Sequence, residues 1–272
     1  MQPIIRNFDV DLRPVPRHWL ADNAAATAIA NGVNLLFPHG ERFFVRSVKY
    51  FLSELDDPEL QRAIRGFFGQ EGRHAHAHDR LNAILRAQGF EIDRFLTRYK
   101  RTSDWLEAHT PPKVRLAVTA ACEHFTAIMA EGAFTEGMLD RAAPEMQQLL
   151  AWHAAEEIEH KAVAFDALRL VDPSYALRIF GLAYATTVLG GFWLWAAISL
   201  LRQEKLGLRG IRRELRKLGQ RGDPIAQRVF LRGIRQYLAR DFHPNDNATE
   251  RLASEWLAAH GISLPGATTE AA

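Results

Sequence analysis

The chain lacks the features that would hold a small secreted domain together. Its 272 residues include a single cysteine, Cys122, which excludes an internal disulfide framework and suits a reducing compartment. The N-terminal segment as far as Leu20 is interrupted by charged side chains and contains no apolar core of a secretory signal. No RNA- or DNA-binding motif is recognisable. The sequence therefore predicts a cytoplasmic protein without a nucleic-acid partner.

Strand patterns are also scarce, whereas helix boundaries are well marked. Asp57-Pro58 and Thr110-Pro111 each place a capping side chain before a proline suited to a first helical turn, and Gly89 fits a helix end. The spacing of apolar residues is helical elsewhere. Residues 91–108 are expected to form a crossover with a short helix. The sequence predicts an all-α protein with helices near 22–36, 38–54, 58–88, 111–137, 144–171, 174–202, 209–220, 224–240 and 249–260.

Two Glu-x-x-His pairs, each with a solitary glutamate upstream, are the main functional signal. The residues concerned are Glu41, Glu71, His74, Glu123, Glu157 and His160. On a helix, residues i and i+3 share a face, so each pair aims a carboxylate and an imidazole at one point. Two glutamates and two such pairs on four inward-facing helices form the ligand set of di-iron and di-manganese carboxylate bundles.

The positions of the four carboxylates along the predicted hairpins support this interpretation. Glu41 and Glu71 lie equally far along the chain from Asp56, the centre of the turn between their helices. Glu123 and Glu157 likewise lie equally far from the turn between their own helices. At a rise of about 1.5 Å per residue, the two pairs lie roughly 22 and 25 Å from their turns. The carboxylates are therefore expected at nearly the same height in the bundle.

Three further residues are candidate catalytic groups. His78 is four residues beyond His74, and His153 is four residues before Glu157, so both share the face of their Glu-x-x-His pair. We expect these histidines to bind a metal, orient a ligand by hydrogen bonding or transfer protons. Glu156 lies off that face and is a candidate general base or partner of a ligand.

Each assignment has an ordinary structural alternative. A single Glu-x-x-His pair is usually a surface pair on a helix, and Glu41 could simply mark a helix start. Glu156 and Glu159 could be solvated charges. Glu131 or Glu136 could replace Glu123 as a ligand, although neither keeps the predicted height. The apolar neighbours of Glu123, among which an unpaired carboxylate would be costly, favour the metal interpretation.

Carboxylate-rich sites with one imidazole per metal suit iron or manganese better than zinc, whose structural sites prefer cysteine. The sequence predicts two metal ions, with iron favoured and manganese or zinc as alternatives, and a small-molecule substrate. The favoured function is a di-iron oxidoreductase acting on an apolar or amphiphilic organic substrate. A metal-dependent hydrolase using a metal-bound hydroxide, with Glu156 or His153 as general base, is the runner-up. A non-catalytic iron-handling protein or metal-stabilised scaffold stays open.

Three sequence motifs carry a family resemblance. The segments Trp152-His153-x-x-Glu156-Glu157-x-Glu159-His160, Pro38-x-Gly40-Glu41 and Gln70-Glu71-x-x-His74 resemble bacterial proteins named predicted metal-dependent hydrolases, which are grouped with the ferritin-like superfamily. The resemblance covers roughly residues 15–245. It implies a ferritin-like four-helix bundle with additional C-terminal helices. It also implies as metal ligands Glu41, Glu71, His74, Glu123, Glu157 and His160. The family's hydrolase label is itself a prediction and adds little about the reaction type.

An apolar helix followed by a basic segment suggests contact with a membrane. The stretch from Ile179 to Leu201 contains no charged or histidine side chain and is long enough to span a bilayer. Residues 202–241 then hold twelve Lys or Arg against four Asp or Glu. The apolar helix could span the membrane, touch its surface, line an apolar substrate cavity, or form a core or homodimer interface. Association with the inner membrane therefore stays open.

The sequence predicts four parts. They are an N-terminal arm (1–21), a dimetal bundle that includes the apolar fifth helix (22–203), a basic helical extension (204–261) and a flexible tail (262–272).

Overall fold

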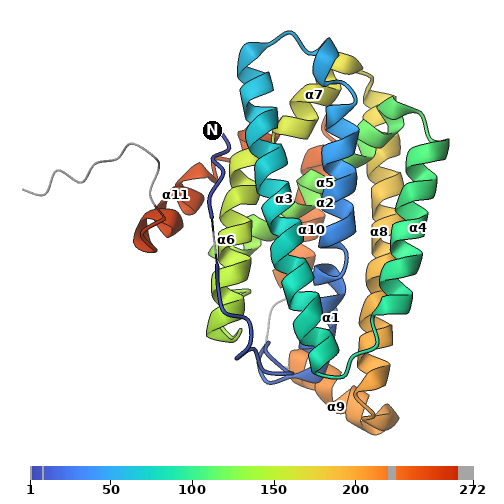
Figure 1. Cartoon of the computed structure of the whole chain (residues 1–272), viewed down its shortest axis with the longest axis vertical. Helices are drawn as coiled ribbons and strands as arrows, with labels where there is room; N and C mark the ends of the chain where they lie inside the picture. The colour runs from blue at the N-terminus through green and yellow to red at the C-terminus, as the bar shows by residue number, and fades with distance from the viewer. Residues whose placement is uncertain (1, 8, 220–224, 263–272) are drawn as a thin grey trace, which may run out of the picture.

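The computed structural model describes residues 2–7, 9–219 and 225–262, and within them the secondary structure is helical (Figure 1). The helices are α1 (Ala24–Asn34), α2 (Phe37–Lys49), α3 (Pro58–Ala87), α4 (Asp93–His109), α5 (Pro112–Thr135), α6 (Pro144–His160), α7 (Val163–Val171), α8 (Tyr175–Gln203), α9 (Gly207–Gly219), α10 (Ile225–Tyr237) and α11 (Glu250–Ala259), with short 3₁₀ helices at Leu52–Glu54 and Pro244–Asp246. The predicted all-α class is confirmed.

The start and end of α3 follow from local chemistry. The side chain of Asp57 accepts hydrogen bonds from the backbone N–H groups of Glu59 and Leu60, and Pro58 occupies the first helical position. Both features stabilise a first turn, where backbone N–H groups lack helical partners. Gly89, just past the end of the helix, has a φ of 88°, which a residue without Cβ adopts at little cost.

Four helices surround the centre of the molecule. Helix α2 packs on α3 and α5 packs on α6, while α2 also contacts α5 and α3 contacts α6. Figure 1 shows α2, α3 and α6 running along the long axis of the molecule, with α8 and α4 beside them. Helix α8 packs along α1 and α5. This arrangement brings the predicted ligand-bearing helices around one volume; the assignment to the ferritin-like superfamily stays a prediction.

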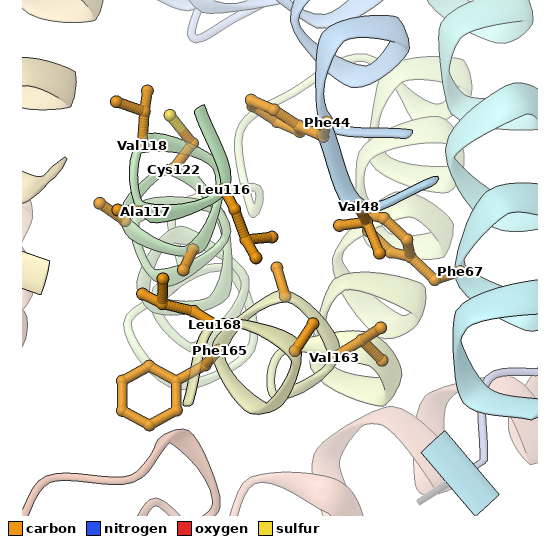
Figure 2. Close-up of a cluster of buried hydrophobic side chains, with 14 of the residues drawn as sticks. Phe44, Val48, Phe67, Leu116, Ala117, Val118, Cys122, Val163, Phe165 and Leu168 are labelled. Atoms are coloured by element: carbon orange, nitrogen blue, oxygen red, sulfur yellow. The ribbon is translucent and has the colours of Figure 1, made fainter. Parts of the chain in front are cut away.

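The largest apolar core closes one end of that volume. Figure 2 shows Phe44 and Val48 of α2, Phe67 of α3 and Val163 of α7 around Leu116 of α5, whereas the ring of Phe165 points away from them. Phe44 follows Glu41 by three residues, and Phe67 precedes Glu71 by four, so the cluster lies about one helical turn from the glutamates. The polar groups are therefore enclosed by dry, packed side chains on this side.

Some predicted boundaries differ from the observed ones. The segment expected to be a crossover with a short helix contains the 17-residue α4, whose Phe95 and Tyr99 rings pack against Phe192 of α8. The predicted helix 144–171 is divided at residues 161–162 into α6 and α7, and the predicted helix 38–54 ends at Lys49 before a 3₁₀ turn. The predicted tail lies outside the described residues except for residue 262, and the division into four parts stays a prediction.

Candidate metal centre

All six predicted ligands are buried in the middle of the bundle. Helix α2 supplies Glu41, α3 supplies Glu71 and His74, α5 supplies Glu123, and α6 supplies Glu157 and His160. Because each Glu-x-x-His pair spans about one helical turn, its carboxylate and imidazole leave the helix on the same side. The two helical hairpins were predicted to carry these residues at nearly the same height, and this agreement accounts for the meeting of the six side chains.

Among the described residues, four groups of buried side chains could hold a metal ion; two of them include His153, and the other two share Glu71. Of the two that share Glu71, one consists of Glu71, Glu123 and His160, and the other of Glu41, Glu71 and His74; within each group the possible ligand atoms all lie within 4.8 Å of one another. A metal bound at about 2.0–2.2 Å by each ligand would hold such atoms within about 4 Å of one another. Small side-chain adjustments would therefore complete each site.

Glu157 lies between the two imidazoles. Its Oε2 is 3.2 Å from Nε2 of His160, and its Oε1 is 3.8 Å from Nδ1 of His74. Nε2 of His160 is in turn 3.2 Å from Oε1 of Glu71. Oε1 of Glu71 also lies 3.6 Å from Nδ1 of His74, so Glu71 and Glu157 each approach both histidines and would be able to hold a metal ion bound at either one.

Several polar atoms facing this volume lack hydrogen-bond partners. Both carboxylate oxygens of Glu41, Glu71 and Glu123 are buried without a hydrogen-bond partner, as is Nδ1 of His74. A buried polar atom without a partner is costly, and a charged one more so. Metal cations would satisfy these oxygens and the imidazole nitrogen together. The residues present therefore fit a metal centre.

Burial and mutual repulsion shift the protonation of the carboxylates. Burial, reinforced by the neighbouring charge of Glu71, raises the pKa of Glu123 to about 8 and raises the pKa of Glu41 well above its ordinary value. Burial alone would lower the pKa of His74, but Glu156 and Glu71 outweigh it and raise this pKa to about 10. In the absence of metal, protons on Glu123, Glu41 and His74 therefore stand in for the positive charge that metal ions would supply.

A second layer of buried polar residues holds His74 and His160, the two histidines among the predicted ligands, in place. His160 donates from Nδ1 to Oε1 of Gln70 at 2.8 Å, and Gln70 donates from Nε2 to Oε2 of Glu159 at 2.7 Å. The guanidinium of Arg6 donates twice to Glu159, each at 2.7 Å. These contacts leave the opposite ring nitrogen of His160 facing the carboxylates.

The same arginine supports the other histidine. His74 donates from Nε2 to Oε2 of Glu156 at 3.0 Å, and Arg6 lies 3.4 Å from Oε1 of Glu156. Glu156 is fully buried, so it is not a solvated charge, and its two oxygens are engaged by Arg6 and His74. This position suits a residue that orients His74, whereas the sequence also offered Glu156 as a general base.

His78 and His153 form a buried dyad beside the ligands. Nε2 of His78 is 2.7 Å from Nδ1 of His153, and Nε2 of His153 is 2.7 Å from Oε1 of Glu157. Burial, followed by the neighbouring histidines, lowers the pKa of both imidazoles. The half-buried ring of Phe37 lies 4.5 Å from each of them. The dyad is thus hydrogen-bonded to Glu157 through His153 and packs against the ring of Phe37.

An apolar hollow lies on another side of the ligands. It has a volume of about 40 Å³ and is enclosed by α2, α4, α5 and α8, with lining residues that include Gly40, Phe44, Tyr99, Cys122 and Val188. Gly40 and Cys122 immediately precede the predicted ligands on their helices. The hollow therefore lies close to Glu41 and Glu123 along α2 and α5, although none of the six predicted ligands lines it.

The structure adds Arg6 and Gln70 to the residues found in the sequence. Gln70 stands next to a predicted ligand and points toward Glu159 and His160. Arg6 belongs to the N-terminal arm and reaches the site only through tertiary packing. The sequence signal for a cationic partner is the pair Glu156 and Glu159, which lies among apolar residues of α6. Buried carboxylates need a cation nearby, so this pair indicates one.

Comparison with known proteins gives one match. A family described as predicted metal-dependent hydrolase matches residues 4–248, and the chain belongs to this family. No curated protein and no solved structure matches the chain. The family description supports the hydrolase alternative better than the favoured oxidoreductase, and it agrees with the buried His and Glu groups that could hold metal ions.

Proposed function

We propose that this protein is a hydrolase with a dinuclear metal centre, acting on an ester or amide that carries an apolar or amphiphilic group. The observation that carries the proposal is the pair of buried ligand groups sharing Glu71, whose oxygens lack partners. Two bound metal ions would polarise the scissile carbonyl and lower the pKa of a water molecule. The family description points to the same reaction class.

The chain's own residues would bind the metals and handle protons. Glu41, Glu123, His74 and His160 would each hold one metal ion, while Glu71 and Glu157 would contact both. His153 is neutral near pH 7 because burial lowers its pKa, so it is able to accept a proton at the site. Its hydrogen bond with His78 offers a path by which that proton moves away from the metals.

The apolar hollow supports the substrate class. Its lining carries aromatic and aliphatic side chains from four helices and lies next to Glu41 and Glu123. With a volume of about 40 Å³, the hollow would admit only a small apolar group of the substrate, whose transfer out of water is favourable. Arg6 and Glu156 would act by positioning His74 rather than by touching the substrate.

The shared carboxylate gives the sharpest test. We expect Glu71→Ala to lose both metal ions and Glu123→Ala to lose one, measured as metal per chain after purification. Glu59→Ala is a matched control on the same helix, because its side chain is 80% exposed. Hydrolysis of p-nitrophenyl esters should fall by roughly 10³-fold or more in Glu71→Ala. Retention of two metals by Glu71→Ala and Glu123→Ala would contradict the ligand assignment.

Oxidation is the second candidate, and the donor set is the observation that favours it. The two groups that share Glu71 each offer one imidazole and two carboxylates, a combination that suits iron or manganese more than zinc. The protein loaded anaerobically with ferrous iron would be exposed to air while its optical spectrum is recorded. If a new near-ultraviolet band appears, dioxygen is consumed and no metal supports ester hydrolysis, the proposed hydrolase function is wrong and oxidation takes its place.

A further inference from the structure

An exposed apolar face runs along α8, on the side opposite the bundle. The buried apolar residues of α8 lie on its inner side and are Gly181, Leu182, Ala185, Ala196, Ala197 and Leu200. They lie against α1 and α5, where Gly181 approaches the backbone of Ala117 so closely that a Cβ would lie 2.5 Å from its carbonyl oxygen. Phe180, Leu194 and Ile198 fall on the other side of the helical wheel and are exposed.

The length of α8 does not make it a simple membrane span. Among the described residues it is the one helix that is long and apolar enough to cross a membrane, and 17% of its most apolar 18-residue window is buried. Its packing along α1 and α5 ties one side of it to the helices that enclose the metal centre. The other side is left free for a partner.

Helix α9, which follows α8 in the chain, adds exposed leucines and positive charge. It begins four residues after α8 ends and lies at the same end of the molecule (Figure 1). Its one acidic residue, Glu214, is buried and pairs with Lys217. On the outer side, Leu208 is 77% exposed and Leu215 is also exposed. Arginines flank both leucines.

These arginines have no acidic partner within the part of the chain that the structure describes. Arg209, Arg212 and Arg216 are exposed on α9, and Arg202 is exposed at the end of α8. An exposed helix with leucines flanked by arginines is typical of segments that lie in the interface of a bilayer. Exposed apolar side chains with unpaired cations beside them match an anionic lipid surface in both chemistry and charge.

We propose that this end of the molecule docks on an anionic membrane surface. The docking surface consists of Leu194, Trp195 and Ile198 of α8, Leu208 and Leu215 of α9, and Arg202, Arg209, Arg212 and Arg216. The leucines, Trp195 and Ile198 enter the headgroup region, while the arginines contact lipid phosphates. Helix α8 lies on the membrane by one face and stays packed in the bundle by the other. This inference does not depend on the proposed hydrolysis.

Vesicle binding tests the docking surface on the full-length protein. We expect co-sedimentation with vesicles that contain phosphatidylcholine and anionic phosphatidylglycerol in a ratio of roughly two to one, and at least tenfold weaker binding to pure phosphatidylcholine. An arginine near an anionic surface strengthens binding roughly fivefold, so Arg212→Gln/Arg216→Gln should weaken binding about 10- to 30-fold. Arg65→Gln/Arg101→Gln, exposed on α3 and α4, is the control and should bind as the wild type does.

The apolar contribution has its own matched pair. Leu194 and Leu170 are both 60% exposed, but Leu170 lies on α7, outside the docking surface. We expect Leu194→Ser/Leu208→Ser to weaken binding about tenfold or more and Leu170→Ser to have no effect. Far-ultraviolet circular dichroism verifies that each variant is folded.

Brominated lipids identify the face that enters the membrane. Trp195 and Trp105 are both exposed, on α8 and α4. Quenching of tryptophan fluorescence by brominated anionic vesicles should drop in Trp195→Phe and persist in Trp105→Phe. Equal binding to neutral and anionic vesicles, or quenching unchanged in Trp195→Phe, would overturn the proposal. So would a stable dimer that Leu194→Ser dissociates and that never binds vesicles, because a second copy would then cover this face.

Discussion

At the scale of single residues, Glu123 illustrates the conflict between stability and metal binding. Burial and the charge of Glu71 raise its pKa to about 8. A carboxylate whose folded-state pKa exceeds its unfolded value contributes stability below the unfolded pKa and loses that contribution as pH rises through the folded one. The metal-free protein should therefore lose stability between about pH 4.5 and 8 through this residue alone.

Glu123→Gln tests this conflict. The amide cannot ionise, so at pH 9 the metal-free variant should be more stable than the metal-free wild type, on the order of 1–3 kcal/mol. At pH 5 the two should differ by less than about 1 kcal/mol. Urea unfolding of chelator-treated proteins at both pH values measures the difference, with the exposed Glu59→Gln as control. Parallel pH profiles for wild type and Glu123→Gln would contradict the raised pKa.

Arg6 carries the second prediction at this scale. Arg6→Ala should destabilise the protein by about 3–5 kcal/mol, because it leaves the buried carboxylates of Glu156 and Glu159 without their cation. Metal affinity should also fall roughly 10- to 100-fold as the liganding histidines lose their support. Arg13→Ala removes an exposed pair with Asp11 and should cost less than about 1 kcal/mol. Unfolding and metal titration measure both effects; equal behaviour of the two variants would contradict the assignment.

The candidate site could be predicted from the sequence only as far as helix geometry reaches. Helical spacing and the distances from the turns were sufficient to group the six ligands, because both depend on a fixed rise and rotation per residue. The support from Arg6 could not be predicted, since periodicity says nothing about which distant segment covers a helix. For the same reason, the sequence did not determine whether Glu156 and Glu159 are buried or exposed to solvent.

At the scale of helices, the contact between α5 and α8 depends on the absence of one side chain. A Cβ at Gly181 would lie 2.5 Å from the carbonyl oxygen of Ala117, whereas one at Gly190 would meet nothing within 4 Å. Gly181→Ala should therefore destabilise the protein by about 1–3 kcal/mol through overpacking. Gly190→Ala on the same helix should stabilise it by about 0.5–1 kcal/mol, because alanine has the better helix propensity. Thermal unfolding separates the two, and destabilisation of equal size in both variants would contradict this packing.

Helix boundaries were predictable where a residue determines them locally. Pro58, with the Asp57 cap before it, begins α3 as expected, and Pro144 begins α6. The length of α4 was underestimated, because its helical face becomes apparent only when Phe95 and Tyr99 meet the aromatic side chains of α8. Tertiary contacts of this kind override weak local signals.

At the scale of the whole molecule, the metal centre links protonation to the stability of the bundle. Its candidate ligands come from α2, α3, α5 and α6, so each bound ion would join helices that are distant in the sequence. A ligand that binds the folded state at a thousand times its dissociation constant stabilises it by about 4 kcal/mol. For a chain of this size, such a gain raises the thermal midpoint by roughly 10 °C.

The stabilisation by metal should increase with pH. Binding displaces protons from Glu123 and His74, whose pKa values without metal are raised to about 8 and about 10. The metal-free protein loses the stability from both groups as pH rises through these values, whereas the loaded protein does not. The gap in thermal midpoint between manganese-loaded and chelator-treated protein should therefore be larger at pH 8.5 than at pH 6. Glu71→Ala should show no gap at either pH, and a gap that shrinks with rising pH in the wild type would contradict proton displacement by the metal.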